Sequence, residues 1–308
     1  MDRHAYMIIA HTNFEQLGLL LQLLDRDSND IYLLIDKKVK NPPREFLKKQ
    51  VKKASLLFTK PVKVSWGGDS VIKAEMQLLK IAIKEEHKYY HLISGMDLPI
   101  KSQNYIYSFF DENDGKNFIS LELNHEHNQN GSTLHRLDYY YPFQNLIGRN
   151  EGRRIKIYKK MQDFLIQLQK GLKYSRTKNN ALTFLKGCNW FSITHEAAQY
   201  VVNNYPRFKS IFRFSLIADE MFMQTILYNS PLSNTIADKN LRLIDWNRGG
   251  PYVFRDDDFE LLVSAREDKI FARKFDERVD NKIIVRLFEY LNSKEEQDFS
   301  ILQKPENK

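Results

Sequence analysis

The chain has 308 residues, a formal net charge of +8 at neutral pH and a pI near 9.2. A content of 42% hydrophobic and 13% aromatic residues excludes a wholly disordered or fibrous protein. The excess of Lys and Arg favours an anionic partner, which leaves nucleic acid, an acidic membrane surface and phosphate-bearing small molecules open.

The cysteine content and the hydropathy limit the cellular compartments in which the protein is expected. The single cysteine, Cys188, excludes an intramolecular disulfide and a cysteine-cluster metal site, and favours a reducing compartment. The longest apolar stretches fall far short of the ~20 residues that a membrane-spanning helix needs. The first residues lack the basic region and cleavage site of a signal peptide. We therefore expect a cytoplasmic protein, with peripheral contact at the inner face of the cell membrane left open.

The first part of the chain alternates strand-like and helix-like segments. Short apolar runs predict strands at residues 6–10, 31–35, 62–64 and 89–93, and periodic apolar positions predict helices at 14–24 and 72–83. This order predicts an α/β protein with a Rossmann-like nucleotide-binding sheet flanked by helices. Polar groups follow the predicted strands, where open parallel sheets bind their ligands.

The second part is less regular. Residues 121–141 predict strands or ordered loops, a strand is predicted at 190–193, and apolar periodicity predicts helices at 153–172, 196–203, 219–228 and 275–291. We expect one domain over residues 1–292, with a nucleotide-binding half at about 1–115 and an acceptor and catalytic half at about 116–292. The polar residues 293–308 predict a flexible tail.

Two segments hold most of the positive charge. Residues 37–63 contain ten Lys and Arg against one acid, and residues 149–178 contain ten against two. Solvated faces explain such runs by default, and binding to nucleic acid or to an anionic membrane is the functional alternative. No helix-turn-helix, zinc-finger or aromatic RNA-binding signature accompanies them, which disfavours nucleic acid.

Common phosphate and metal motifs are missing from the sequence. There is no Walker sequence, no paired-glycine dinucleotide loop and no His-Glu-x-x-His helix. His125 and His127 are spaced to share one side of a strand as metal ligands, but lack a third ligand of known spacing. Asp25 and Asp27 form an Asp-x-Asp pattern, which we interpret as coincidental because it follows a predicted helix rather than a strand.

Four separated blocks resemble one enzyme family, in the family's order and over nearly the whole chain. They are the strand pair at 5–11 and 31–38, residues 66–79 leading to HLISGMDLPIK at 91–101, DEMFMQT at 219–225, and IFARKFD at 270–276. Together they resemble the core-2/I-branching β-1,6-N-acetylglucosaminyltransferases of glycosyltransferase family 14, which also contains protein O-xylosyltransferases and plant glucuronosyltransferases. The resemblance implies a GT-A type fold and inverting transfer from a UDP-sugar to a hydroxyl of a glycan or glycoconjugate.

The resemblance implies that Glu220 is the catalytic base. Inverting transfer needs one general base to take the proton from the acceptor hydroxyl. The structural alternative is a carboxylate that merely complements the dipole at a helix start, a role that Asp219 can also fill. With the resemblance, we favour catalysis by Glu220.

The resemblance also implies how the leaving UDP is stabilised. Its developing negative charge must meet a positive group. Most GT-A enzymes hold a metal with Asp-x-Asp, whereas Ser94-Gly95-Met96-Asp97 offers one carboxylate at the corresponding position. We therefore expect no divalent metal or other cofactor, and expect Lys274 to bind the diphosphate with help from Arg273 or Arg255.

The remaining donor positions lie at predicted strand ends. His11 and Asp36 resemble positions of the family's nucleotide site. Ser94 and Asp97 are expected to position the donor sugar or to fix their loop, and Gly95 to let the backbone approach a ligand closely.

The acceptor positions match the family loosely. They are Glu122, Arg136 and Trp246. An exposed Trp stacks readily on a sugar face, and a buried core Trp remains the alternative.

The donor and the cellular setting stay open at this stage. N-acetylglucosamine is the expected donor sugar, and UDP-xylose or UDP-glucuronic acid are alternatives within the family. One cysteine and no anchor differ from the eukaryotic members, so we expect a prokaryotic cytosolic version that acts in surface polysaccharide synthesis on a glycan or a lipid-linked glycan. The basic helix at 153–172 would then lie on anionic lipid. A nucleic-acid- or polysaccharide-binding protein without catalysis is the alternative from another class.

Overall fold

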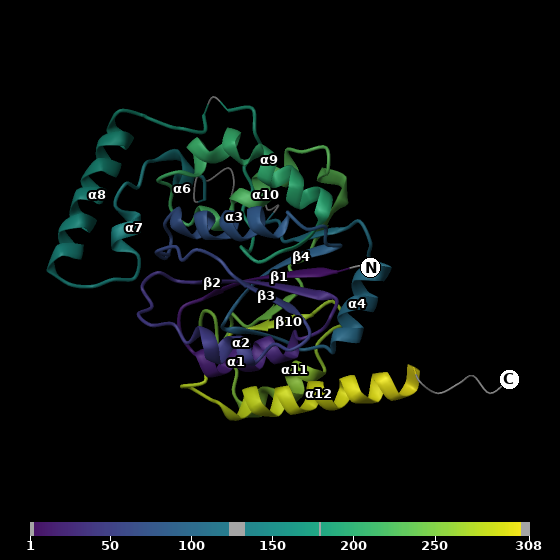
Figure 1. The fold of residues 1–308 in the computed structure, drawn as a ribbon. Helices are drawn as coiled ribbons and strands as arrows, with labels where there is room; N and C mark the ends of the chain where they lie inside the picture. The colour runs from purple at the N-terminus through teal and green to yellow at the C-terminus, as the bar shows by residue number, and fades with distance from the viewer. Residues whose placement is uncertain (1–2, 123–132, 179, 303–308) are drawn as a thin grey trace.

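A seven-stranded sheet forms the centre of the computed structural model, which describes residues 3–122, 133–178 and 180–302 (Figure 1). Its first four strands are parallel neighbours in the order β3-β2-β1-β4: Ser55–Phe58, Asn29–Ile35, His4–Ala10 and Tyr89–Ser94. This is the arrangement that the βαβ pattern predicts, so the α/β class and the Rossmann-like sheet are confirmed.

The other strands tie the two predicted halves of the chain together. β7 (Ser192–Thr194) continues the sheet antiparallel to β4, and β6 (Asn117–Ile119) and β8 (Ile236–Asp238) follow it. A second sheet contains β5 (Asp97–Pro99), β10 (Phe271–Arg273) and β9 (Arg242–Ile244), in that order. Each sheet therefore combines strands from before and after residue 115.

Helices lie on both faces of the large sheet (Figure 1). One face carries α3 (Ser70–Ala82), α9 (His195–Phe212) and α10 (Phe222–Tyr228), and the other carries α1 (Phe14–Leu23), α2 (Arg44–Lys49), α11 (Phe259–Val263) and α12 (Lys282–Leu302). The shorter helices are α4 (Gln103–Glu112), α6 (His135–Asp138) and α7 (Gln144–Ile147), with 3-10 turns η1 (Ala218–Glu220), η2 (Ser233–Thr235) and η3 (Asp256–Asp258). α8 (Arg153–Gly171) lies at the edge of the molecule, beside α7. Within the described residues, no helix is long and apolar enough to cross a bilayer.

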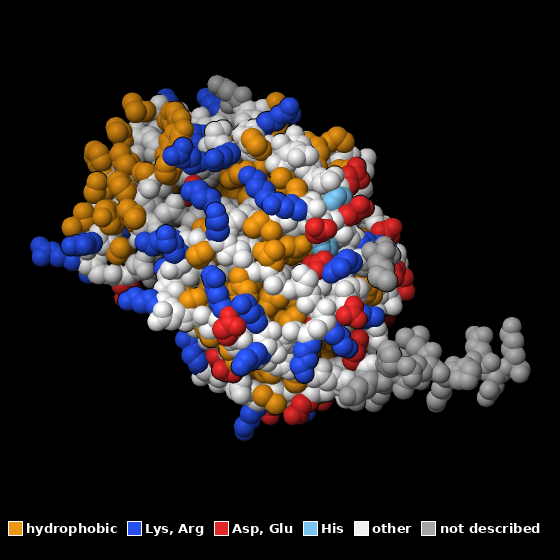
Figure 2. All heavy atoms as spheres, viewed as in Figure 1, with side chains coloured by type: hydrophobic (Ala, Val, Ile, Leu, Met, Phe, Trp, Pro, Cys, Tyr) orange, Lys and Arg blue, Asp and Glu red, His pale blue; other side chains and the backbone are white. Residues whose placement is uncertain are grey.

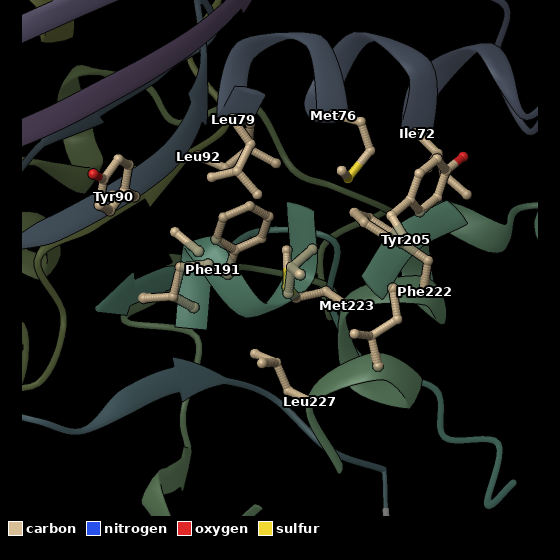
Figure 3. Close-up of a cluster of buried hydrophobic side chains, with 14 of the residues drawn as sticks. Ile72, Met76, Leu79, Tyr90, Leu92, Phe191, Tyr205, Phe222, Met223 and Leu227 are labelled. Atoms are coloured by element: carbon tan, nitrogen blue, oxygen red, sulfur yellow. The ribbon is translucent and has the colours of Figure 1, made fainter. Parts of the chain in front are cut away.

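The strands separate two hydrophobic cores. In β1, Ala5 and Met7 belong to one core and Tyr6 and Ile8 to the other, because successive side chains of a strand point to opposite faces. Figure 3 shows the first core, where α3 meets α9 and α10 through Ile72, Met76, Leu79, Tyr205, Phe222, Met223 and Leu227. This packing holds η1, which directly precedes α10, against the sheet.

Two predictions of short elements are wrong. The third strand is residues 55–58 and not 62–64, which run beside residue 37 through one backbone hydrogen bond, Lys37 N–H to Val62 O at 2.9 Å. The helix predicted at 219–228 divides into η1 and α10, so Glu220 precedes the α-helix instead of lying in its first turn.

The C-terminal prediction is also partly wrong. The last helix begins at Lys282 rather than at residue 275, because residues 275–281 form a loop that binds the N-terminal part of the chain. α12 then continues to Leu302, so the flexible tail predicted from residue 293 is helical that far.

Candidate active site

The carboxyl ends of β1, β2 and β4 bring the predicted donor residues together. The N–H of Asp36 donates to Ala10 O at 2.9 Å, and the N–H of Gly95 donates to Ile9 O at 3.1 Å, so the residues after the three strands stay side by side. Desolvation lowers the pKa of His11, and the charge of Asp36 opposes this shift. His11 and Asp36 therefore lie close enough for the charge of Asp36 to affect the pKa of His11, as their predicted places at adjacent strand ends imply.

Asp97 and Arg273 form an ion pair across β5 and β10. Nη1 of Arg273 lies 2.6 Å from Oδ1 of the buried Asp97 and donates to Ser94 Oγ, also at 2.6 Å. The other Asp97 oxygen accepts the Ser94 N–H at 2.7 Å. The guanidinium carbon of Arg273 lies 4.6 Å from the ring centroid of Trp190. Both oxygens of Asp97 and the orientation of Arg273 are thus fixed within the protein.

Lys274 differs from Arg273 in its surroundings. Burial lowers the pKa of its half-buried ammonium, and the positive charges of Arg273, Arg149 and Arg278 lower it further. The charge of Lys274 lowers the pKa of His11. The N–H of the next residue, Phe275, donates to Met96 O at 2.9 Å, so the main chain beside Lys274 lies against the loop after β4. Among the described residues, no carboxylate lies within ion-pair distance of Lys274, whereas Arg273 and Arg278 pair with neighbouring acids. Lys274 is therefore a cation that is available to an anionic ligand.

The loop after β10 is held onto the loop after β1. Nδ2 of Asn13 donates to Asp276 Oδ1 at 2.9 Å, and the N–H of Gln16 donates to Glu277 Oε2 at 2.6 Å. These hydrogen bonds join positions more than 250 residues apart in the chain. These hydrogen bonds hold residues 276 and 277, and therefore the main chain near Lys274, next to the residues after β1.

Gly95 packs closely against β1. A Cβ at this position would lie 3.2 Å from the Cβ of Ala10 and 3.7 Å from Leu17 Cδ1. The missing side chain therefore permits close packing of the β4 end against β1, and the expected approach of a ligand at this glycine stays a prediction.

Glu220 and Arg136 form the second group. Nη1 of Arg136, from α6, donates to Glu220 Oε2 at 2.8 Å, and the Glu220 side chain remains 34% exposed. The main chain of η1 is held as well, because the N–H of Gly187 donates to Glu220 O at 2.8 Å. A Cβ on Gly187 would lie 1.8 Å from Ser120 O, so only glycine fits there. The predicted base and one predicted acceptor residue are thus in contact.

Glu122 borders the same group. Its carboxylate pairs with the ammonium of Lys186, and its N–H donates to Lys186 O at 2.8 Å. Lys186 directly precedes Gly187, whose N–H binds Glu220 O. The segment at residues 186–187 therefore lies between Glu122 and Glu220. The next residues along the chain, including His125 and His127, lie outside the described residues. In the described ranges, no three His, Cys, Asp or Glu side chains are grouped to hold a metal ion.

Two buried carboxyl groups lie behind Glu220. Burial raises the pKa of Asp219 to about 7, and the charge of Glu220 adds to that shift. Burial also raises the pKa of Glu75, from α3, and the charge of Asp219 adds to it. Neither Glu75 oxygen, nor Oδ1 of Asp219, has a hydrogen-bond partner among the described residues. Asp219 is therefore buried and is not an exposed carboxylate that complements a helix dipole, which was the alternative role considered for it. Glu75 was not identified from the sequence.

The loop between β9 and η3 borders Lys274. The N–H of Lys274 donates to Tyr252 O at 3.3 Å, and the N–H of Phe254 donates to Lys274 O at 2.9 Å. Trp246, in this loop, is 63% exposed, so the alternative of a buried core Trp is wrong. The main chain of Arg255 follows Phe254, and its side chain is exposed. Its contribution to the donor site remains a prediction.

Arg149 is a candidate that the sequence analysis missed. Its guanidinium lies 5.0 Å from the ring centroid of Trp66, and its charge lowers the pKa of Lys274. In the sequence it is one of ten cations in residues 149–178, and nothing in that run distinguishes it from the others.

Residues 187–190 connect the two groups of the site. Gly187 holds the main chain of Glu220, and Trp190 stacks on Arg273. One short segment thus contacts both the predicted base and the cation cluster. The partly exposed carboxylate of Glu220 and the ammonium of Lys274 thus belong to one framework. A carboxylate can accept a proton, and an ammonium can stabilise an anionic leaving group.

Known proteins resemble the chain along most of its length. A family model described as Core-2/I-Branching enzyme matches residues 4–257. Xylosyltransferase 2 of Rattus norvegicus is 22% identical over 313 residues, covering 92% of this chain and 33% of that protein. A xylosyltransferase of Ciona intestinalis is 21% identical, covering 92% and 34%. The chain therefore spans about a third of the length of these relatives.

Solved structures resemble the chain more distantly. Mouse xyloside xylosyltransferase 1 in its apo form aligns with a TM-score of 0.40 and 10% identity, covering 88% of this chain and 97% of that one. Core-mannan synthase A of Aspergillus fumigatus, in its Mn/GDP form, aligns with a TM-score of 0.35 and 10% identity, covering 75% and 71%.

Proposed function

The chain belongs to the Core-2/I-branching family of glycosyltransferases, and on that premise we propose that it transfers a sugar from a UDP-sugar to a hydroxyl of a glycan, with inversion and without a divalent metal. The observation that carries the proposal is the arrangement around Lys274. The main chain beside Lys274 is attached to the loops after β4 and β1, because the N–H of Phe275 donates to Met96 O and Nδ2 of Asn13 donates to Asp276 Oδ1, both at 2.9 Å. The neighbouring Arg273 is held by Asp97.

Asp97 does not fit a metal ion. A divalent cation held by GT-A enzymes needs free carboxylate oxygens. One Asp97 oxygen accepts from Arg273 and the other from the Ser94 N–H, and no second acid lies in the segment 94–97. The positive charge that meets the diphosphate therefore comes, in this proposal, from Lys274 with Arg149 and Arg273 nearby.

Glu220 supplies the base. Its carboxylate takes the proton of the acceptor hydroxyl while that oxygen forms a bond to the anomeric carbon. The bond from the anomeric carbon to the β-phosphate oxygen breaks on the opposite side, and its electron pair leaves with UDP, whose charge Lys274 stabilises. Arg136 orients the carboxylate by binding its Oε2, which leaves Oε1 for the acceptor hydroxyl.

The uridine and the acceptor take the remaining positions. His11 and Asp36 face the nucleotide, because they end the strands beneath Lys274. The exposed ring of Trp246 offers a stacking surface for a sugar of the acceptor, and Glu122 offers a hydrogen-bond acceptor. We assign the acceptor to a glycan or lipid-linked glycan of a prokaryotic surface polysaccharide, made in the cytoplasm.

Two donor sugars compete within the proposal. N-acetylglucosamine is favoured by the GMDLPIK block at 95–101, which is nearest the branching enzymes. UDP-xylose is favoured by the xylosyltransferases among the relatives.

A donor screen tests the proposal. UDP-N-acetylglucosamine, UDP-xylose and UDP-glucuronic acid are incubated with the protein, with and without EDTA, and released UDP and bound UDP are measured. We expect UDP binding, and hydrolysis of one donor at a rate that EDTA does not change. Hydrolysis abolished by EDTA contradicts the metal-free mechanism. Salt-sensitive binding to nucleic acid without affinity for UDP, or polysaccharide binding without any transfer, contradicts the function itself.

A further inference from the structure

α8 exposes a continuous apolar stripe. Ile157, Met161, Phe164, Leu168 and Leu172 are between 46% and 71% exposed, and their spacing of three and four residues places them along one side of the helix. We call these five residues the α8 stripe. Figure 2 shows hydrophobic side chains gathered along the edge of the molecule where Figure 1 places α8. An exposed apolar patch of this kind marks an interaction surface.

A different side of α8 attaches it to the protein. Nε2 of Gln162, the one buried residue of the helix, donates to Gln144 Oε1 of α7 at 3.2 Å. Tyr158 stacks on Phe143 with ring centroids 5.7 Å apart. Internal packing thus uses Tyr158 and Gln162 and leaves the α8 stripe uncovered, although the sequence periodicity combines Tyr158 and Met161 in one apolar series.

The charge around the stripe selects its partner. Residues 153–173 contain one acid, Asp163, and seven cations: Arg153, Arg154, Lys156, Lys159, Lys160, Lys170 and Lys173. Two copies of this chain that met through α8 would bring both sets of cations together. An anionic bilayer accepts the apolar side chains at its headgroup boundary and pairs its phosphates with the Lys and Arg.

We propose that the α8 stripe and its flanking cations dock the protein on an anionic membrane surface, with the helix axis in the plane of the membrane. α8 is joined to the site through α7, because Nε2 of Gln144 also donates to Trp66 O at 3.2 Å, and Arg149 between α7 and α8 stacks on Trp66. Docking therefore fixes the distance between the bilayer and the candidate active site. The proposal does not depend on the sugar-transfer chemistry.

Vesicle flotation tests the docking surface. The full chain is mixed with vesicles of phosphatidylcholine alone, or of phosphatidylcholine with phosphatidylglycerol. We expect flotation with the anionic vesicles and little with the neutral ones. The double variant Phe164→Ser/Leu168→Ser should bind anionic vesicles about tenfold more weakly, since it removes the most deeply inserted groups. Arg154→Gln/Lys160→Gln should weaken binding by a similar factor, because these exposed cations lie three residues before and after Ile157 and so flank the stripe.

Matched variants distinguish loss of docking through α8 from the general effect of removing any exposed apolar side chain or any positive charge. Leu261→Ser removes an exposed apolar side chain on α11, and Lys282→Gln removes an exposed cation at the start of α12; both should float as the unchanged protein does. All variants should keep the circular dichroism spectrum and the UDP affinity of the unchanged protein. Equal flotation with neutral and anionic vesicles overturns the proposal. So does a dimer in solution that Phe164→Ser/Leu168→Ser converts to a monomer, since a second copy then covers the stripe.

Discussion

Oε2 of Glu220 lies 2.8 Å from Nη1 of Arg136, and this contact joins the 3-10 turn before α10 to a helix that begins more than 80 residues earlier. Because the ion pair is made through one carboxylate oxygen, Oε1 remains for an acceptor hydroxyl. The orientation of the proposed base therefore depends on α6 as well as on its own turn.

Replacing Glu220 by Gln should remove catalysis and leave the fold intact. The amide is isosteric but cannot accept the proton, so kcat should fall by ~10²–10⁴-fold, the usual effect of losing a general base. Transfer and donor hydrolysis are measured together with UDP affinity, which should not change. Glu196→Gln, on the exposed side of α9, is the control and should keep full activity. Near-normal turnover of Glu220→Gln would remove the residue from the mechanism.

Arg136→Gln tests the orientation of the base. Losing a hydrogen bond to a charged group should reduce kcat by roughly 10- to 100-fold, while the KM for the donor stays unchanged. Arg136→Lys keeps the charge and should restore part of kcat. An increase in donor KM with unchanged kcat would instead place Arg136 in the donor site.

The cations around Lys274 should determine UDP affinity. Lys274→Met should weaken UDP binding, measured by calorimetry, by roughly 10- to 100-fold, and Arg149→Met by a smaller factor, because each removes a charge near the diphosphate. Both effects should diminish at high salt, which screens the remaining charges. Lys282→Met is the control for net charge. Equal UDP affinity of Lys274→Met and Lys282→Met would rule out the assignment.

Glu75→Gln should stabilise the protein at neutral pH. Burial raises the pKa of Glu75, so the folded state keeps a proton that the unfolded chain loses above its ordinary pKa. Stability from this group is therefore full at low pH and decreases as the pH rises toward the folded-state pKa. The variant avoids this loss, so its free energy of unfolding relative to the unchanged protein should be higher at pH 7.5 than near pH 4. Urea unfolding at pH 7.5 should show the gain, and unfolding near pH 4 should show none. A variant that is less stable at both pH values contradicts the shift.

Gly187→Ala should destabilise the protein and disturb Glu220. The added methyl would lie 1.8 Å from Ser120 O, so the segment must move, at a cost of about 1–3 kcal/mol in the free energy of unfolding. The displaced N–H should also release Glu220 O and lower kcat. Gly171→Ala is the control, because nothing lies within 4 Å of its Cβ position. Equal stability of the two variants would show that the loop adapts without strain.

The sequence predicts the parts of the fold that rest on long, continuous patterns. Strands β1, β2 and β4 are apolar runs buried on both faces, and such runs are visible without knowledge of the partners. The strands β5, β9 and β10 have three residues each, which is too short for a period to appear. Their pairing nevertheless sets Asp97 opposite Arg273, so the ion pair at the donor site had no local signal.

Some residues of the candidate site can likewise be recognised from the sequence, and others cannot. Glu220 and Lys274 follow from motifs that can be recognised along the chain. Arg149 and Glu75 do not, because their importance comes from three-dimensional neighbours. Glu75 is a single acid in an amphipathic helix, a pattern typical of an exposed position. The packing of α3 against the sheet, α9 and η1 makes it buried.

The hydrogen bonds from Asn13 to Asp276 and from Gln16 to Glu277 also constrain how the protein is made. A ribosome releases the loop after β1 more than 250 residues before the residues that bind it. A nascent chain that ends before residue 270 contains β1, β2, β4 and Glu220 but lacks Arg273 and Lys274 and the residues that attach them to the loop after β1. On the proposed function, we expect nucleotide affinity only after residues 270–277 have been released.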